Sequence, residues 1–153
     1  MGEKMNIGEI CTRITVFAYP TMSVNEAARL MLEQHVGCVV VVEETGRGRR
    51  VLGMLTDRDI TVAVVAREFN AQSTRVADIM SPSPVTCRPE DSMTDVLQLM
   101  QRDGVRRMPV TDALGTLVGI ATLDDLIEVV AEDLHGLVRV IENERKREAH
   151  VRG

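Results

Sequence analysis

Two Thr-x-x-Asp pairs are the residues of this chain best suited to bind a polar ligand. Thr56 and Asp59 form the first pair, and Thr122 and Asp125 form the second. An ionised carboxylate accepts two hydroxyl hydrogen bonds, so each aspartate could hold a cis-diol. A helix that begins at each pair would add free backbone N–H groups and a partial positive charge, which suit phosphate. The pairs therefore indicate two related binding sites in one molecule.

The same spacing also has a purely structural interpretation. A threonine followed three residues later by an acidic residue can form a capping box, in which each side chain accepts a hydrogen bond from the other residue's backbone. Capping alone does not require the same pair twice, so the repetition favours ligand binding by at least one site. The two roles are compatible, because a capping threonine can still face a cleft.

The two pairs belong to a long internal repeat. Thr122 follows Thr56 by 66 residues, whereas upstream positions such as Pro20 and Pro89 are separated by 69. The excess of three residues falls in the polar, glycine-rich loop 44–50, which is typical of a hairpin connection. Each half is one copy of a unit of about 60 residues, which buries little core alone. We therefore expect the two copies to pack as one globule.

Each half is expected to fold in the order β-α-β-β-α. In the first half, periodicity and capping residues predict an extended piece at 14–17, a helix at 24–35 after Ser23, strands from 38 and at 51–55, and a helix at 57–68. In the second half they predict an extended piece at 85–86, a helix from Ser92 to about 102, strands at 108–110 and 117–121, and a helix after Thr122. Residues 76–80 are expected to form one helical turn.

The C-terminal helix is expected to be longer than the repeat and to continue through Arg147. Its apolar residues are spaced 3, 4, 3, 4, as in a heptad seam: Ile127, Val130, Leu134, Leu137 and Ile141. The seam could pack on its own domain or form a dimer contact. The domain boundaries that follow are 5–68 for repeat 1, 69–74 for the linker, 75–133 for repeat 2 and 134–153 for the helical extension.

Composition excludes several classes of function. The hydrophobic content of 44% is enough for a packed core, and with 2% aromatic residues that core must be aliphatic. No apolar run approaches the roughly 18 residues needed to span a membrane, and the net charge of −5 argues against nucleic-acid binding. The three cysteines are widely spaced, which predicts reduced thiols and a cytoplasmic location. No nucleophile–base pair or metal cluster is visible, so we do not expect an enzyme.

These residues resemble a known family. The duplicated β-α-β-β-α unit, with Gly-x-x-Thr-x-x-Asp closing each copy, resembles the CBS domain pair, or Bateman module. The phrase Val-Arg-Arg-Met-Pro-Val at 105–110 also fits that pattern. The resemblance covers about residues 5–131. It implies a free-standing pair of α/β repeats packed as one globule with pseudo-two-fold symmetry, and the extended C-terminal helix would follow it.

The resemblance implies a regulatory sensor that binds an adenosine-type ligand in the cleft between the repeats. AMP or ATP comes first, with ADP, NAD and S-adenosylmethionine as further candidates, and no cofactor is required. In such modules the aspartate holds ribose hydroxyls, and an arginine before the Pro-Val strand meets phosphate. The resemblance implies that Thr56, Asp59, Arg106, Arg107, Thr122 and Asp125 bind the ligand. The aliphatic side chains of Val85 and Pro109 could enclose the purine, and with Arg58 they complete the candidate site.

The two copies differ at the phosphate position. Arg106 and Arg107 stand before the strand of the second copy, whereas Gly37 and Cys38 stand there in the first. Arg58 could supply the positive charge in the first copy, so the two sites should differ in affinity. We expect a homodimer and an unidentified regulated protein as partners, without nucleic acid or membrane insertion. The alternative is a ligand-free scaffold for protein interaction and oligomerisation.

Overall fold

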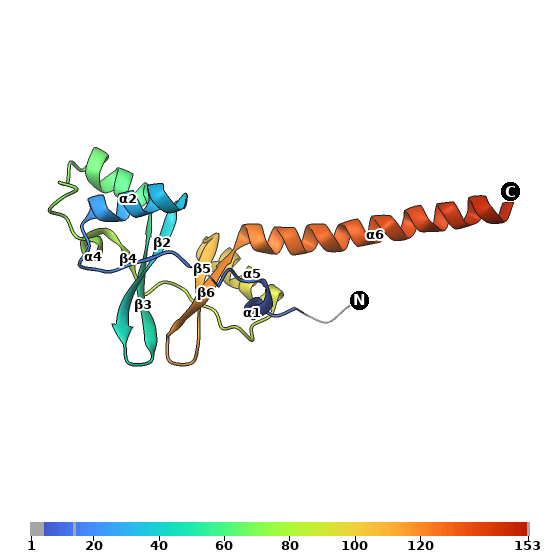
Figure 1. The fold of residues 1–153 in the computed structure, drawn as a ribbon, viewed down its shortest axis with the longest axis horizontal. Helices are drawn as coiled ribbons and strands as arrows, with labels where there is room; N and C mark the ends of the chain where they lie inside the picture. The colour runs from blue at the N-terminus through green and yellow to red at the C-terminus, as the bar shows by residue number, and fades with distance from the viewer. Residues whose placement is uncertain (1–4, 14, 153) are drawn as a thin grey trace.

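Two β-hairpins form the centre of the protein in a computed structural model that describes residues 5–13 and 15–152 (Figure 1). The first hairpin pairs β2 (Cys38–Thr45) with β3 (Gly48–Thr56), and the second pairs β5 (Arg107–Thr111) with β6 (Leu117–Thr122). The hairpins lie side by side, because an isolated bridge joins Arg50 of β3 to the turn of the second hairpin. The duplicated sequence thus folds into two similar halves.

Each hairpin carries a short extended segment on either edge. β1 (Phe17–Ala18) pairs with β2 and β4 (Ser81–Pro82) with β3, in the order β1-β2-β3-β4. In the second half, single bridges from Cys87 to Val110 and from Thr12 to Ile120 occupy the equivalent places. The expected piece at 85–86 is therefore displaced to Cys87, and Ile14 of the first expected piece lies outside the described residues.

The helices α2 (Val24–Gln34) and α5 (Met93–Asp103) begin at the predicted serine caps. Ser23 Oγ accepts a hydrogen bond from the backbone N–H of Glu26 at 3.1 Å. Ser92 forms a complete capping box with Asp95. Both helices end at a residue in the left-handed conformation, which is a common way to stop a helix.

The helix expected at 57–68 changes its winding. It begins as α3 (Asp57–Ile60) and continues as the π-helix η1 (Thr61–Ala66). The second segment contains Thr61, Val62, Val64 and Val65, and β-branched side chains crowd the preceding turn of an α-helix. A wider turn relieves that crowding, and π-helical turns are frequent at functional sites.

The segments that precede the two repeats exchange places. α1 (Ile7–Ile10) leads into the first repeat, but Ile7 is fully buried in the core of the second half. α4 (Val76–Ile79) leads into the second repeat, but Val76 is fully buried in the core of the first. Each hydrophobic core is therefore built from one repeat and from the leading segment of the other. This exchange ties the two halves into one unit.

The last helix leaves the body of the protein. α6 (Leu123–Arg152) begins directly after β6, and only Leu126 is buried against the body. From residue 131 to residue 152 every position is exposed, and the helix projects far beyond the two halves (Figure 1). The prediction of a helix that outgrows the repeat is confirmed, and the structure extends it to Arg152.

Cys87 should make the stability of the fold fall at alkaline pH. Its thiol is 2% exposed and donates to the carbonyl oxygen of Pro109 at 3.8 Å, and burial raises its pKa to about 12. Because the folded pKa exceeds the ordinary value of 9.0, the stabilisation is complete below pH 9 and is lost as the pH rises towards 12. Urea unfolding should give a lower free energy of unfolding at pH 10.5 than at pH 7.5. Cys87→Ala should reduce that difference, and an equal fall in both proteins would contradict the assignment.

Candidate ligand-binding site

Thr56 and Asp59 form a complete capping box where β3 ends and α3 begins. The backbone N–H of Asp59 donates to Thr56 Oγ1 at 3.1 Å, and the backbone N–H of Thr56 donates to Asp59 Oδ2 at 2.9 Å. One oxygen of the Asp59 carboxylate is therefore already used by the fold. The structural interpretation of the Thr-x-x-Asp spacing holds for the first copy, and its second carboxylate oxygen is left for other partners.

Thr122 and Asp125 make only one half of the same arrangement. The backbone N–H of Asp125 donates to Thr122 Oγ1 at 3.1 Å. Asp125 Oδ2 is buried and has no hydrogen-bond partner among residues 5–13 and 15–152. A buried acceptor without a partner destabilises a protein, so such groups require a specific explanation. The second copy thus presents a carboxylate oxygen that helix capping does not explain.

Beside each Thr-x-x-Asp pair lies the leading segment of the other repeat. Burial raises the pKa of the Cys11 thiol, the Arg13 guanidinium opposes that rise and the nearby Asp125 carboxylate adds to it. Cys11 and Arg13 belong to the segment after α1, which crosses β6 at Gly119. The equivalent segment at Met80 crosses β3 at Gly53. Each aspartate therefore lies in its own repeat, beside the leading segment of the other.

A pocket of about 410 Å³ opens at the first pair. Arg58 and Asp59 line it from α3, Arg67 and Phe69 from the chain after η1, and Asp78 from α4. Two guanidinium groups, two carboxylates and an aromatic ring suit a ligand that has an apolar ring, hydroxyl groups and phosphate. The volume is within the range of small-molecule sites.

Apart from Arg58 and Asp59, sequence reasoning missed the residues that line this pocket, and Arg67, Phe69 and Asp78 are those with a charged or aromatic side chain. Phe69 is 41% exposed within a polar linker, and an aromatic residue in such a segment could have drawn attention. Asp78 lies in the single helical turn of α4, which was expected as a turn without a place in a site. Its contribution depends on the exchange of leading segments, and local patterns do not reveal that exchange.

Arg107 lies close to the first copy although it belongs to a strand of the second. Burial raises the pKa of the Cys38 thiol, and the Arg107 guanidinium beside it opposes the rise, while Asp59 and Asp57 add to it. Arg106 instead lies near the second pair, where its Nη2 is 3.8 Å from Asp124 Oδ1 in an exposed ion pair. The two neighbouring arginines therefore approach different copies.

The two apolar residues expected at the site differ in exposure. Val85 is partly buried and packs against the core of the second half. Pro109 is less than 2% exposed, in the middle of β5, so it presents almost no surface to a ligand in this structure. Of the two, only Val85 retains surface that a ring could contact.

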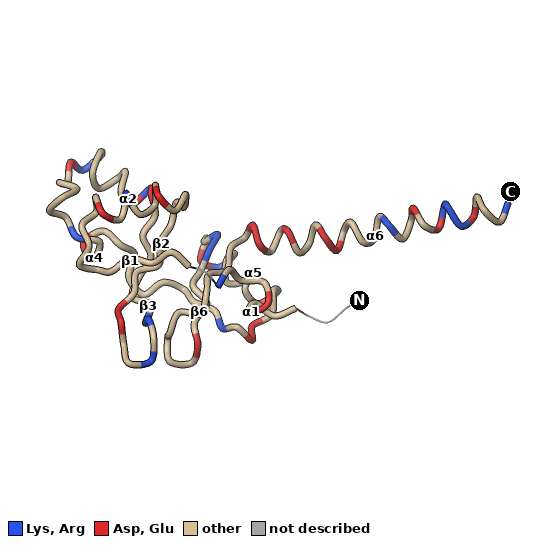
Figure 2. Tube along the Cα trace, in the orientation of Figure 1, with Lys and Arg blue, Asp and Glu red and all other residues tan. Residues whose placement is uncertain are grey.

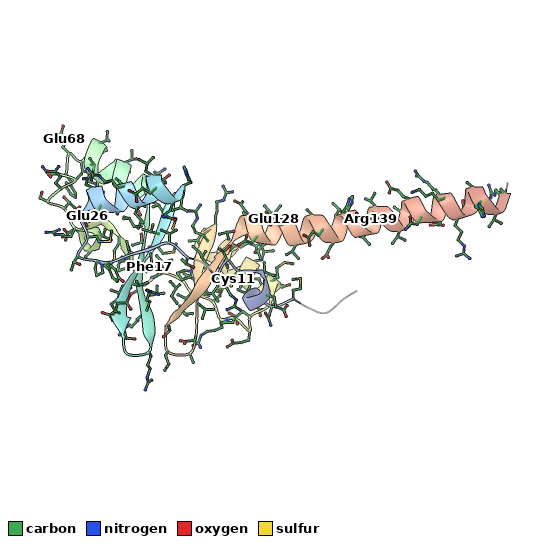
Figure 3. All side chains as sticks on the ribbon, in the orientation of Figure 1. Cys11, Phe17, Glu26, Glu68, Glu128 and Arg139 are labelled. Carbon is green, nitrogen blue, oxygen red and sulfur yellow. The ribbon has the colours of Figure 1, made fainter. Side chains whose placement is uncertain are left out.

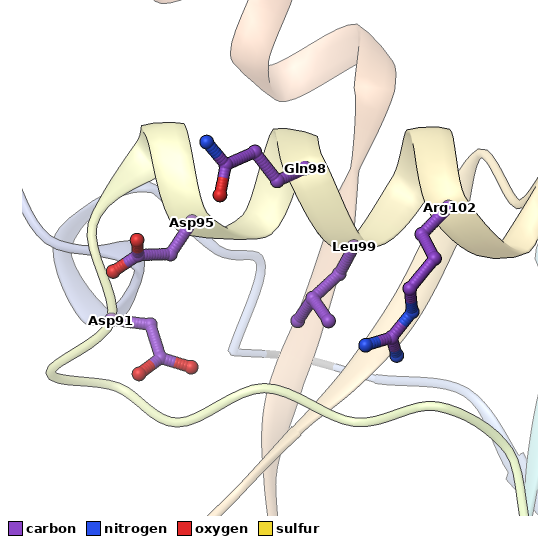
Figure 4. Close-up of a pocket in the computed structure, with 5 residues that line it drawn as sticks. All are labelled: Asp91, Asp95, Gln98, Leu99 and Arg102. Atoms are coloured by element: carbon purple, nitrogen blue, oxygen red, sulfur yellow. The ribbon is translucent and has the colours of Figure 1, made fainter.

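A second pocket of about 470 Å³ lies against α5 (Figure 4). It is lined by Asp91, Asp95, Gln98, Leu99 and Arg102. Asp91 accepts a hydrogen bond from the backbone N–H of Arg88 at 2.8 Å, and Asp95 takes part in the capping box of α5. This pocket contains none of the site residues expected from the sequence.

The described residues also limit other kinds of site. Residues 5–13 and 15–152 contain no group of three histidine, cysteine or acidic side chains that could hold a metal ion. In the same part of the chain, no helix is both long and apolar enough to cross a membrane. Cys11, Cys38 and Cys87 are free thiols.

Comparisons with known proteins agree with this architecture. The family model described as CBS domain matches residues 7–66 and 76–132. An uncharacterised protein of Methanopyrus kandleri is 32% identical over 143 residues, which cover 94% of this chain and 69% of the relative.

Solved structures share the fold. The crystal structure of an uncharacterised conserved protein from Pyrococcus horikoshii is 31% identical, with a TM-score of 0.73 over 85% of this chain and 95% of the other. CBSX2, a CBS-pair protein of Arabidopsis thaliana, in complex with AMP is 24% identical, with a TM-score of 0.70 over 83% of this chain and 96% of the other. At that identity the second likeness concerns the fold alone.

Proposed function

Because the chain belongs to the CBS domain family, we propose that it is a regulatory module that binds an adenosine-type ligand in the cleft between its two repeats. The observation that carries the proposal is the buried oxygen Oδ2 of Asp125, which has no partner within the described residues. Two vicinal ribose hydroxyls would both donate to this carboxylate and remove the energetic penalty. The threonine of the same pair, Thr122, holds the backbone of Asp125 in place.

We assign the phosphate of the ligand to the arginines. Arg106 serves the second copy, and Arg107 and Arg58 serve the first, where Arg67 lines the same pocket as Arg58. A planar guanidinium matches phosphate oxygens in geometry and charge. Val85 is the apolar residue that we place against the purine.

The two sites should have unequal affinities. One oxygen of Asp59 already accepts a hydrogen bond from the backbone N–H of Thr56, whereas Asp125 Oδ2 has no partner among residues 5–13 and 15–152. We therefore expect the site of the second copy to bind more tightly. Binding would shift the population of conformations in the whole module, because each site contacts both repeats.

AMP and ATP are the first ligands to test, followed by NAD and S-adenosylmethionine. CBSX2, which has this fold, was crystallised with AMP, and this supports the capacity of the fold for adenosine ligands. Isothermal calorimetry should show saturable binding of at least one of the four. The corresponding 2′-deoxy analogue should bind at least tenfold more weakly, since it lacks one hydroxyl that donates to the carboxylate. Equal affinities for the ligand and its 2′-deoxy analogue would contradict a contact between the ribose and the Asp125 carboxylate.

A second function is a ligand-free scaffold that serves assembly alone. The exposed apolar side chains along α6 favour this alternative, because such a surface is typical of protein contacts. If none of the four ligands raised the melting temperature of the protein, the scaffold would be the better description.

A further inference from the structure

An apolar stripe runs along one side of α6 and is open to solvent in this structure. It consists of Ile127, Val130, Leu134, Leu137 and Ile141, each between 52% and 60% exposed. The spacing of 3, 4, 3, 4 keeps these side chains on one face of a helix and is the repeat of a coiled coil. Val138 and Val140 flank the stripe and are also exposed. A row of five exposed aliphatic residues indicates a contact surface.

The outer part of α6 has no tertiary support. Every residue from 131 to 152 is exposed, and the side chains of Arg139 and its neighbours project from the helix well beyond the body (Figure 3). Most of the stability of a protein helix comes from packing of its apolar face rather than from intrinsic propensity. A helix of this length with an uncovered stripe therefore implies a partner.

Charge is distributed unevenly along α6, and this distribution indicates which partner packs on the stripe. Residues 123–138 carry five carboxylates and no lysine or arginine. Residues 139–152 carry five basic and three acidic side chains, a net charge of +2. Figure 2 shows the acidic half next to the body and the basic groups towards the free end. The helix is thus complementary in charge to a reversed copy of itself.

We propose that α6 of a second copy of this chain packs antiparallel on the stripe. The antiparallel order places the acidic half of each helix against the basic half of the other, whereas a parallel order would oppose the two sets of five carboxylates. An anionic membrane surface is disfavoured by the same acidic half, because interfacial helices carry lysine and arginine on their polar face. This contact goes beyond ligand binding and does not depend on it.

The stripe sets the register of the pair. When Leu134 faces Leu137 of the second copy, Val130 faces Ile141 of the second copy, and two-fold symmetry repeats both contacts. Four consecutive layers are then apolar. A shift of one heptad towards the body also keeps the stripes in contact, but it places Asp133 opposite Asp133 of the second copy, so charge favours the first register.

This register also defines an ion pair on the flank of the seam. Asp124 lies opposite Arg145 of the second copy, at the positions that flank the core in a coiled coil. Asp124 is 80% exposed at its side chain and, within the described residues, its side chain pairs only with Arg106 at 3.8 Å. It is therefore accessible to a second cation.

Analytical ultracentrifugation of the full chain should show a particle of twice 16.9 kDa. The double variant Leu134→Asp, Leu137→Asp should raise the dissociation constant of the dimer at least 100-fold. Asn143→Asp adds one carboxylate on the outer face of α6 and should leave the dimer intact. Circular dichroism separates loss of the contact from unfolding of the body. A wild-type chain that is monomeric at 100 μM, or a dimer that survives the double variant, would overturn the proposal.

A charge exchange tests the orientation. Asp124→Arg and Arg145→Asp should each weaken the dimer about tenfold, and the two changes in one chain should restore the wild-type dissociation constant. In a parallel pair these residues lie far apart, so the two effects would add instead. Additive effects, or sedimentation of the monomer with vesicles of phosphatidylcholine and phosphatidylserine, would contradict an antiparallel second copy as the partner.

Discussion

Asp125→Ala should lower the affinity for AMP about 100-fold and leave the unliganded protein as stable as the wild type, or more stable by about 1 kcal/mol. The loss of affinity follows from two charge-assisted hydrogen bonds, which together contribute about 3 kcal/mol. The unchanged or raised stability follows from the buried oxygen Oδ2, which lacks a partner within the described residues and is removed with the side chain. A residue kept at the expense of stability is typical of a functional site.

The matched control is Asp59→Ala in the first copy. Asp59 accepts a hydrogen bond from the backbone of Thr56 at 2.9 Å, so its removal should destabilise the protein by about 1 kcal/mol. Urea unfolding and calorimetry on both variants give the two readouts. If Asp125→Ala destabilised the protein as much as Asp59→Ala does, its carboxylate would be structural and the ribose assignment would lose its support.

Gly119→Ala should destabilise the protein by about 2 kcal/mol or more. A Cβ atom at Gly119 would lie 2.6 Å from the backbone oxygen of Thr12 and 3.1 Å from Cys11 Sγ. Because the nearest atom is backbone, the segment after α1 must move away from β6, and forced overpacking costs about 1–3 kcal/mol. Thermal unfolding should show the loss, and the thiol of Cys11 should react faster with a thiol reagent.

Gly136→Ala is the control for that change. A Cβ atom at Gly136 meets no atom within 4 Å, and alanine is favoured over glycine in a helix by about 1 kcal/mol. This variant should therefore unfold at the wild-type temperature or above it. An equal loss in both variants would mean that the close crossing at Gly119 does not constrain the fold.

The order of the elements could be predicted from the sequence because its signals are local. Serine caps, valine-rich strands and the repeat offset each depend on neighbouring residues. The exchange of α1 and α4 could not be predicted in this way, since Ile7 and Val76 have the same local pattern whichever repeat they pack on. The contributions of Cys11 and Asp78 to the site depend on that exchange.

The two Thr-x-x-Asp pairs illustrate the same limit at the level of one side chain. Their spacing is identical, yet Asp59 accepts a hydrogen bond from the backbone N–H of Thr56, whereas Asp125 Oδ2 has no partner within the described residues. The conformation of each carboxylate is set by its tertiary surroundings. The π-helical turn after α3 is a further case, because a run of β-branched residues was predicted as ordinary α-helix.

Because α6 is continuous, a structural change at the second Thr-x-x-Asp pair would move the far end of the helix. Asp125 lies in the first turn of a helix of 30 residues, which is about 45 Å long at the usual rise. A tilt of about 5° at this turn would move the far end by about 4 Å. In such a movement α6 would act as a lever arm that pivots at the second Thr-x-x-Asp pair. Two such levers laid against each other could not swing independently, so a movement at one fulcrum would be transmitted to the other.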